Sequence, residues 1–563
     1  MQSGIPPGEM EAELKGDLRD NNEESLNETT ESVHVDSKDE EKQPAKPEQP
    51  VWVNGLQLWL IMFAITLVCF LMLLDIAILS TATPKITSQF HSLVDVGWYG
   101  AAYQLASASM QPLTGKIYSN FNLKWTFFAF IVLFEFGSLL CGVATSSNML
   151  IVGRAVAGMG GSGLQNGALT IISACVPMHK RPALLGVIMG FAQLGIVGGP
   201  LIGGLFTEYV TWRWCFYLNL PLGALAVTFL TFLQIPELSV KEPPMKVLRD
   251  IHNKLDLVGF VIFAPAAVML LLALQWGGNQ YPWNSSVVIG LFCSAGATFL
   301  VWLAWDYYKK DKAMIPLSML RKQHVWVSGV SMGFLSSSMT ILSYYLPIYF
   351  QSVRGKSAAI SGVYLLPGIL SQLIGAVSSG KLVGKFGYYL PWAVASGVLT
   401  AVGYGALSTL NPTSSTGKWI GFQIIAGIGR GFGLQMPLVA VQNTIAPAQI
   451  PTAMALIMFS QTFFGALFLS FSDTIFTNSL RSLLHQDAPN VDAQAVIKAG
   501  AYGFRQIVKP ELLSGVLNAY SGSIDRIFYL CASLATGCFF LAWGMGWVDI
   551  REKKQPTKPQ ESK

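Results

Sequence analysis

Four charged side chains lie inside long apolar stretches of the sequence: Asp75, Glu135, Arg154 and Arg430. Apolar stretches of about twenty residues cross a membrane, and an ionisable group within one is costly and by default functional. Asp75 precedes the outer end of its stretch by about eight residues, and Arg154 follows the outer start of its own by about five. At 1.5 Å per residue, both therefore lie roughly 8–12 Å below the same surface, where they could handle a proton.

The composition is that of a membrane protein, with 563 residues, 52% hydrophobic and 12% charged. Segments long and apolar enough to span a bilayer recur along the chain, separated by loop signals. We expect fourteen spans, at 57–81, 97–116, 126–145, 149–174, 183–206, 215–235, 256–275, 286–306, 326–350, 358–380, 389–409, 418–440, 452–475 and 527–547.

The distribution of charge predicts the topology. One set of short loops carries fifteen Lys and Arg and the opposite set five, so the positive-inside rule places both termini in the cytoplasm. The acidic tail 1–50 is predicted to be disordered, and the tail 548–563 to be cytoplasmic. The loop at about 476–526 and the sequon at Asn284 are then external, so Asn284 is a candidate glycosylation site. We expect the plasma membrane, with the vacuolar membrane as the alternative.

An internal repeat relates the two ends of the chain. AGMGGSGLQN at 157–166 recurs as AGIGRGFGLQM at 426–436, and GKIYSNFNLKW at 115–125 as GKLVGKFGYYL at 380–390, the latter at an offset of 265. This predicts a six-span bundle over 55–235, a linker with two inserted spans over 236–325, and a second bundle over 326–547. Arg154 aligns with Gln423 and Arg430 with Gly161, so the halves differ chemically.

Four motifs carry a resemblance to a known family: LDIAILSTATPKI (74–86), GRAVAGMGGSGLQNG (153–167), LGIVGGPLIGG (194–204) and WRWCFYLNLPLG (212–223). Together they resemble the fourteen-span drug:proton antiporters of the major facilitator superfamily, and most of all fungal toxin-efflux pumps. The resemblance implies an all-α integral membrane fold with two six-helix bundles plus two inserted helices. It implies proton-coupled efflux of a small apolar toxin, metabolite or drug.

The stretch 194–204 is similar to the antiporter signature of that family. Glycines every four residues let two membrane helices approach closely, and a proline kinks the helix. The resemblance implies that this face packs against the second bundle, on the 358–380 span; a generic small-residue contact is the alternative. The residues concerned are Gly195, Gly198, Gly199, Pro200, Gly203 and Gly204.

The family's first and fourth spans line one cavity, so the resemblance implies an Asp75–Arg154 pair on the proton pathway. Protonating Asp75 would free Arg154 and bias the cavity toward its other face. A static buried salt bridge is the alternative. Glu135, in FEFGSLLCG, is either a second protonatable site or a structural carboxylate facing a neighbouring helix.

The family's loop between the second and third spans holds the inner gate with G-x-L-x-D-R-x-G-R-[RK]. Here Gly115 and Lys124 keep their places, but Ser119 stands at the Asp position and Asn120 at the following Arg. We therefore expect hydrogen bonds in place of a charge relay at this gate.

Polar residues within other spans are candidates for the substrate cavity: Gln104, Gln165, Arg430, Gln435 and Gln461. The G-x-G-x-x-G at 158–163 lies in a span without a preceding strand, so it does not predict nucleotide binding. We expect no enzyme activity, cofactor, metal or nucleic acid; the expected partners are a small-molecule substrate, protons and the lipid bilayer, and the protein is expected to be a monomer. The rival functions are a siderophore or basic amino-acid carrier of the same superfamily, or a non-transporting sensor or channel.

Overall fold

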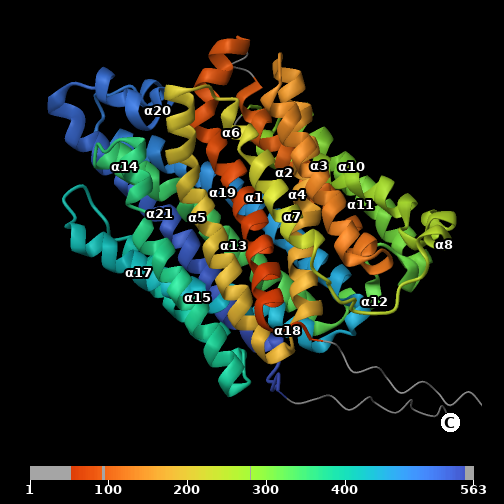
Figure 1. The fold of residues 1–563 in the computed structure, drawn as a ribbon. Coiled ribbons are helices and arrows are strands. Elements are labelled where there is room, and N and C mark those ends of the chain that lie inside the picture. Colours follow the sequence, from red (N-terminus) through yellow and green to blue (C-terminus); the bar gives the residue numbers. More distant parts are fainter. Residues whose placement is uncertain (1–51, 92–94, 279, 552–563) are drawn as a thin grey trace, which may run out of the picture. The chain divides into compact units, whose positions relative to one another are not determined.

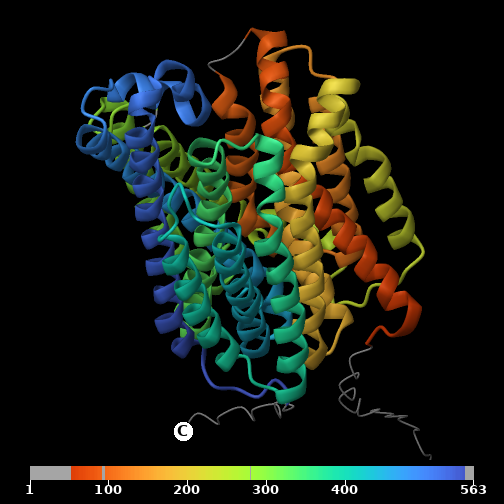
Figure 2. The ribbon, with the colours of Figure 1, turned by 90° about the vertical axis from the view of Figure 1, so that its left-hand side faces the viewer.

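The computed structural model describes residues 52–91, 95–278 and 280–551, which form helices and the connections between them. The acidic tail expected over 1–50 lies outside the described residues, as does the chain after 551. Within the described unit, the half of the chain from red to yellow stands beside the half from green to blue (Figure 2).

The first half contains six expected spans, and each is found as a helix. α1 packs along α5, and α4 packs against both α2 and α3. The last span is broken at Leu218 into a single turn and a longer helix. The helices are α1 (Gly55–Phe90), α2 (Val96–Asn120), α3 (Leu123–Gly142), α4 (Ser147–Cys175), α5 (Arg181–Tyr209), α6 (Trp214–Tyr217) and α7 (Asn219–Thr231).

The linker and the inserted pair follow. α10 lies against a helix of each half: Trp276 makes an edge contact with Trp98 of α2, and Phe263 makes one with Phe459 of the second half. α11 packs mainly on α10. The helices are α8 (Pro244–Arg249), α9 (Ile251–Lys254), α10 (Leu257–Trp276), α11 (Ser286–Lys309) and α12 (Leu317–Leu320).

The second half repeats the pattern of the first, with α17 packed against both α15 and α16. The expected span 418–440 is broken between α17 and α18, and 358–380 between α14 and α15. The helices are α13 (Gln323–Ile348), α14 (Ala358–Val363), α15 (Leu366–Phe386), α16 (Leu390–Leu407), α17 (Thr416–Gly433), α18 (Met436–Thr444), α19 (Ile450–Asp487), α20 (Ala493–Ile507) and α21 (Pro510–Ala542).

Twelve helical segments in the described part are long and apolar enough to cross a membrane. The two expected spans outside this set are α2 and α4, which are long enough but less apolar. Most residues of α4 are buried against other helices. A helix enclosed by protein does not need an apolar surface, which explains its glycine-rich sequence.

The segment 476–526, expected to be a long loop, is mostly helical in the structure. α19 continues to Asp487, α20 follows, and α21 begins at Pro510. α20 is held by its apolar face, because the buried Phe504 stacks on Tyr520 at 4.7 Å. The prediction of a loop was wrong because an amphipathic helix of this kind has the polarity of a loop.

Different segments lie at the two ends of the helical bundle. We call the end with the start of α1, the connection 232–256 and α12 the linker end, and the opposite end, with α6 and α20, the α20 end (Figure 1).

Candidate functional site

Asp75 of α1 and Arg154 of α4 form a buried ion pair. Nη1 of Arg154 donates to Oδ2 of Asp75 at 2.5 Å, and each residue is 1% exposed. A second hydrogen bond orients the guanidinium: Nε of Arg154 donates to the carbonyl oxygen of Tyr99 on α2, at 2.9 Å. The depths estimated from sequence thus correspond to a direct contact between the two side chains.

The pair is enclosed by side chains from three further helices. Asn219 of α7 donates to Oδ1 of Asp75 at 3.2 Å and to Ser138 of α3 at 3.0 Å. The ring of Tyr103 on α2 covers the guanidinium, with Cζ of Arg154 4.7 Å from the ring centroid. A charged pair with so many fixed partners is held in one geometry.

Glu135 of α3 lies apart from this hydrogen-bonded cluster. It faces Gly223 of α7, and among the described residues no group bonds its buried Oε2. Gly223 leaves room for the carboxylate, which a side chain there would displace. The position matches the expectation of a carboxylate facing a neighbouring helix, and its role in proton transfer remains a prediction.

The glycines of the 194–204 stretch contact α1. A Cβ at Gly195 would lie 2.6 Å from the carbonyl oxygen of Phe70, one at Gly199 would lie 2.5 Å from Cβ of Ala77, and Gly203 faces Ile78 and Thr81. The expected contact of this face with the 358–380 span was therefore wrong. Close packing of α5 on α1 is the physical reason, because α1 offers the backbone approach that glycines allow.

The remaining residues of this stretch are looser. Gly198 is half-buried near Leu74, Gly204 has no atom within 4 Å of an added Cβ, and Pro200 lies inside the continuous helix α5.

Other faces of α5 meet the second half, along α15 and at α14, and the closest backbone approach is nearer the linker end. A Cβ at Gly186 would lie 2.6 Å from the carbonyl oxygen of Ala376 on α15, and one at Gly380 of α15 would lie 2.5 Å from that of Pro182. The two halves thus touch at backbone distance through the first turns of α5 and the last turns of α15.

The last turns of α2 form the second contact between the halves at this end. A Cβ at Gly115 would lie 2.7 Å from Cα of Thr452 on α19, so only glycine fits. Ser119 shares a hydrogen bond with Thr452 at 3.3 Å. A hydroxyl pair therefore stands where the family's motif has a charge.

We expect a disulfide at this contact to arrest the protein. With Ser119→Cys and Thr452→Cys in a Cys293→Ser background, oxidation should join residues whose hydroxyl oxygens are 3.3 Å apart and lower transport about tenfold or more, reversibly with reductant. Transport in proteoliposomes measures this, with the two single-cysteine variants as controls. Full activity of the cross-linked protein would show that this contact need not open.

Two lysines tie this region to neighbouring segments of the first half and the linker. Nζ of Lys124 donates to the carbonyl oxygens of Thr231 and Leu233, at 2.7 and 2.9 Å. Nζ of Lys241 donates to those of Tyr118 and Ser119 at the end of α2, at 2.9 and 2.7 Å. Burial lowers the pKa of Lys241. An ammonium group at a helix C-terminus also complements its dipole.

Replacing Lys241 by methionine is expected to lower the free energy of unfolding by about 1–3 kcal/mol, since it leaves two half-buried carbonyls without their donor. Thermal unfolding of the purified protein measures the loss. The matched control is Lys246→Met, because Lys246 is 74% exposed. If both substitutions lower the stability equally, the two hydrogen bonds of Lys241 make no specific contribution.

The cavity candidates fall into two groups. Gln104 is exposed and Gln461 half-buried, and the structure gives neither a hydrogen bond within the described residues. The others are engaged: Gln165 accepts from Gln111 at 3.4 Å, Gln435 donates to Ala376 at 2.7 Å, and Arg430 is buried in the second half. Within the described residues, no hydrogen bond joins any two of these five.

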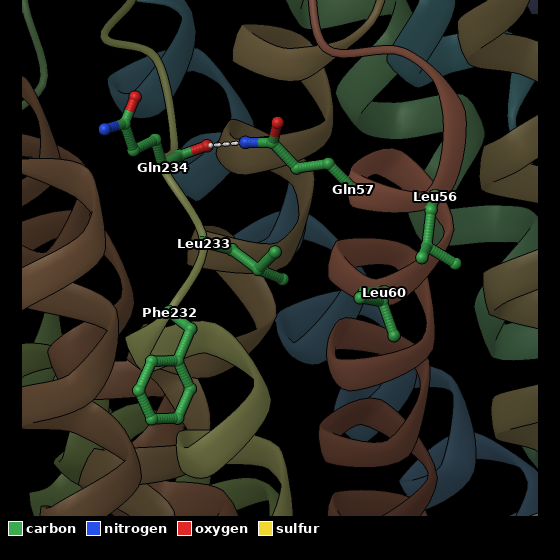
Figure 3. Close-up of a pocket in the computed structure, with 6 residues that line it drawn as sticks. All are labelled: Leu56, Gln57, Leu60, Phe232, Leu233 and Gln234. Atoms are coloured by element: carbon green, nitrogen blue, oxygen red, sulfur yellow. Dashed lines mark hydrogen bonds between the residues drawn. The ribbon is translucent and has the colours of Figure 1, made fainter.

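A groove at the linker end lies between the start of α1 and the residues after α7 (Figure 3). Gln57 donates to the carbonyl oxygen of Gln234 across it, at 2.9 Å. At the other end, Asn284 is exposed and precedes Ser285, whose hydroxyl caps α11. Neither place adds a group to the buried ion pair.

Three residues of these sites were not predicted from the sequence. Tyr103 and Asn219 contact the ion pair, and Thr452 contacts Ser119 at the end of α2. Asn219 had a signal, as a single amide inside an apolar span within the quoted motif 212–223. Tyr103 and Thr452 had none, because their types are common in spans.

Two bundles of this kind with a buried ion pair define a membrane transporter, and comparison with known proteins gives the family. The family model "Major Facilitator Superfamily" matches residues 65–469, and the chain belongs to that family. It is 62% identical to "MFS-type transporter pigP" of Monascus ruber over 91% of this chain and 90% of that protein. It is 51% identical to "Efflux pump mlcE" of Penicillium citrinum over the full length of both.

Solved structures show the same fold. The proton:xylose symporter XylE, 15% identical, matches with a TM-score of 0.56 over 87% of this chain and 96% of that one.

Proposed function

We propose that this protein exports a small, largely apolar toxin, secondary metabolite or drug in exchange for protons. The single observation that carries the proposal is the buried Asp75–Arg154 pair, packed between α1 and α4. The relative from Penicillium citrinum, 51% identical over its whole length, is named an efflux pump. The proton gradient supplies the driving force of such a pump, and a group that gains and loses a proton inside the membrane couples that gradient to transport.

The exchange follows from the chemistry of the pair. When Asp75 takes up a proton it loses its charge, and Arg154 then keeps only neutral partners such as the carbonyl of Tyr99. An arginine cannot lose its proton, so the unpaired positive charge of Arg154 favours a rearrangement of the helices around it. Release of the proton on the other side restores the pair.

Alternating access uses the two contacts at the linker end. The Ser119–Thr452 hydrogen bond and the backbone contact of Gly186 with Ala376 support a closed gate on this side. In the proposed cycle they separate to admit substrate and close before its release.

The proposed organisation is six, two and six spans, with bundles at 55–235 and 326–547 and an inserted pair at 236–325. The linker end carries the Lys-rich loops, so we propose that it faces the cytoplasm, with both termini on that side, in the plasma membrane. We propose a monomer, since each chain contains the complete ion pair.

The test is uptake into proteoliposomes under an imposed pH gradient, with a panel of apolar aromatic and polyketide-like compounds. Uptake of at least one compound only with the gradient supports the proposal. If the compounds enter equally fast with and without the pH gradient, and a proton ionophore does not change the rate, the protein is a uniporter or channel instead.

A further inference from the structure

Arg430 of α17 is a buried cation whose partners are all neutral. Its Nε donates to Oε1 of Gln372 at 3.1 Å, Nη1 to the hydroxyl of Tyr404 at 3.3 Å, and Nη2 to the carbonyl oxygen of Gly368 at 3.4 Å. Arg430 is 3% exposed. In the described part of the chain, none of the four ion pairs includes it.

Comparison with Arg154 shows that, among the described residues, Arg430 has no carboxylate partner. Arg154 is neutralised by Asp75, whereas Arg430 keeps its charge without a carboxylate. Burying a charge costs free energy, and an arginine cannot avoid this cost by losing its proton. A buried charge is therefore expected to have a partner of opposite charge. Neutral acceptors at 3.1–3.4 Å supply only part of that compensation.

The backbone of α15 approaches this guanidinium closely at Gly368. At the repeat offset of 265, Gly368 corresponds to Tyr103, whose ring covers Arg154 in the first half. At Gly368 no side chain is present, and an added Cβ would make tight contacts of 3.3 Å with Nη2 of Arg430 and with Oε1 of Gln423. An anion that reaches Arg430 must therefore displace the neutral groups that now surround it.

The groups around Arg430 can turn toward an anion. Nε2 of Gln372 has only a weak contact, with Sδ of Met339 at 3.8 Å, so the amide is able to rotate and donate. The hydroxyl of Tyr404 now donates to Ser338 at a long 3.3 Å. Guanidinium, amide and phenol would then present donors to one oxyanion, in the fork geometry that carboxylates match.

The helix that carries Gln372 also forms the contact between the halves. Leu373, the next residue of α15, is met by Gly190 of α5. Movement of the halves during transport therefore moves this helix and changes access to Arg430.

We propose that Arg430, with Gln372 and Tyr404, binds an acidic group of the exported molecule, such as a carboxylate. This rests on the proposed export function and narrows its substrate class to acidic apolar compounds.

The experiment compares 1-naphthoate with its uncharged methyl ester as probes in thermal unfolding of the purified full-length protein. We expect naphthoate to stabilise the wild type, with an apparent affinity about tenfold to a hundredfold tighter than in Arg430→Gln, and the ester to act equally on both. Arg430→Lys should be intermediate. Arg213→Gln, which removes a cation at the α20 end, is the control and should match the wild type.

Equal stabilisation of wild type and Arg430→Gln by naphthoate would overturn the proposal, as would a naphthoate effect no larger than that of the ester. If Arg430→Gln fails to fold, the ratio in Arg430→Lys decides in the same way. The binding assay does not require transport, so the two proposals can fail separately. If the ester is taken up under a pH gradient but naphthoate does not bind at Arg430, the acidic-substrate proposal fails and the export proposal stands. If naphthoate binds at Arg430 but no compound is transported, the export proposal fails and the anion site stands.

Discussion

Replacing Asp75 by asparagine is expected to abolish transport driven by a pH gradient. Asparagine has the size of the native residue and keeps an oxygen facing Arg154, but it cannot exchange a proton. Because the carboxylate accepts from both Arg154 and Asn219, the change also weakens the charge-assisted contact. Initial rates in proteoliposomes with and without the gradient measure the effect.

The matched control for this variant is Asp95→Asn. Asp95 also accepts a hydrogen bond from α4, through Ser147 at 2.6 Å, but lies outside the buried cluster. It should keep most of the wild-type rate, with both variants present in the membrane at equal amounts. Undiminished pH-driven transport by Asp75→Asn would make the pair a static salt bridge.

A valine at Gly195 is expected to lower transport about tenfold to a hundredfold. An added Cβ would lie 2.6 Å from the carbonyl oxygen of Phe70 and 2.8 Å from the amide nitrogen of Leu74, so α1 must shift. Leu74 precedes Asp75, and a displacement of about 1 Å is enough to spoil a precisely placed group. We therefore propose that the glycines of the 194–204 stretch act by positioning the carboxylate.

Gly204→Val provides the comparison within the same motif, because no atom lies within 4 Å of its Cβ position. It should be nearly neutral in both transport and thermal unfolding. If both valines are equally harmful, or equally harmless, packing on α1 does not explain the motif.

Much of the fold follows from the sequence because spans are long apolar segments with few alternatives in lipid. The depth of Asp75 and Arg154 was predictable from residue counts along two helices. The partner of the 194–204 face was not, since glycine spacing shows that a close contact exists but not which helix provides it. Likewise, the helical α20 was hidden by its polar composition.

The sites were recovered unevenly for a similar reason. A charge in an apolar span stands out, whereas Tyr103 and Thr452 are ordinary residues whose importance lies in what they touch. The hydrogen bond from Lys241 to Ser119 joins the linker to the end of α2, 122 residues away, a contact that no local pattern contains.

The most direct measurement is proton movement driven by substrate alone. Liposomes containing the protein and a trapped pH-sensitive dye are given a substrate gradient with no pH difference across the membrane. Protons should move against the direction of substrate flow in the wild type, and not in Asp75→Asn. Substrate flow without any change in internal pH in the wild type would contradict exchange at the Asp75–Arg154 pair.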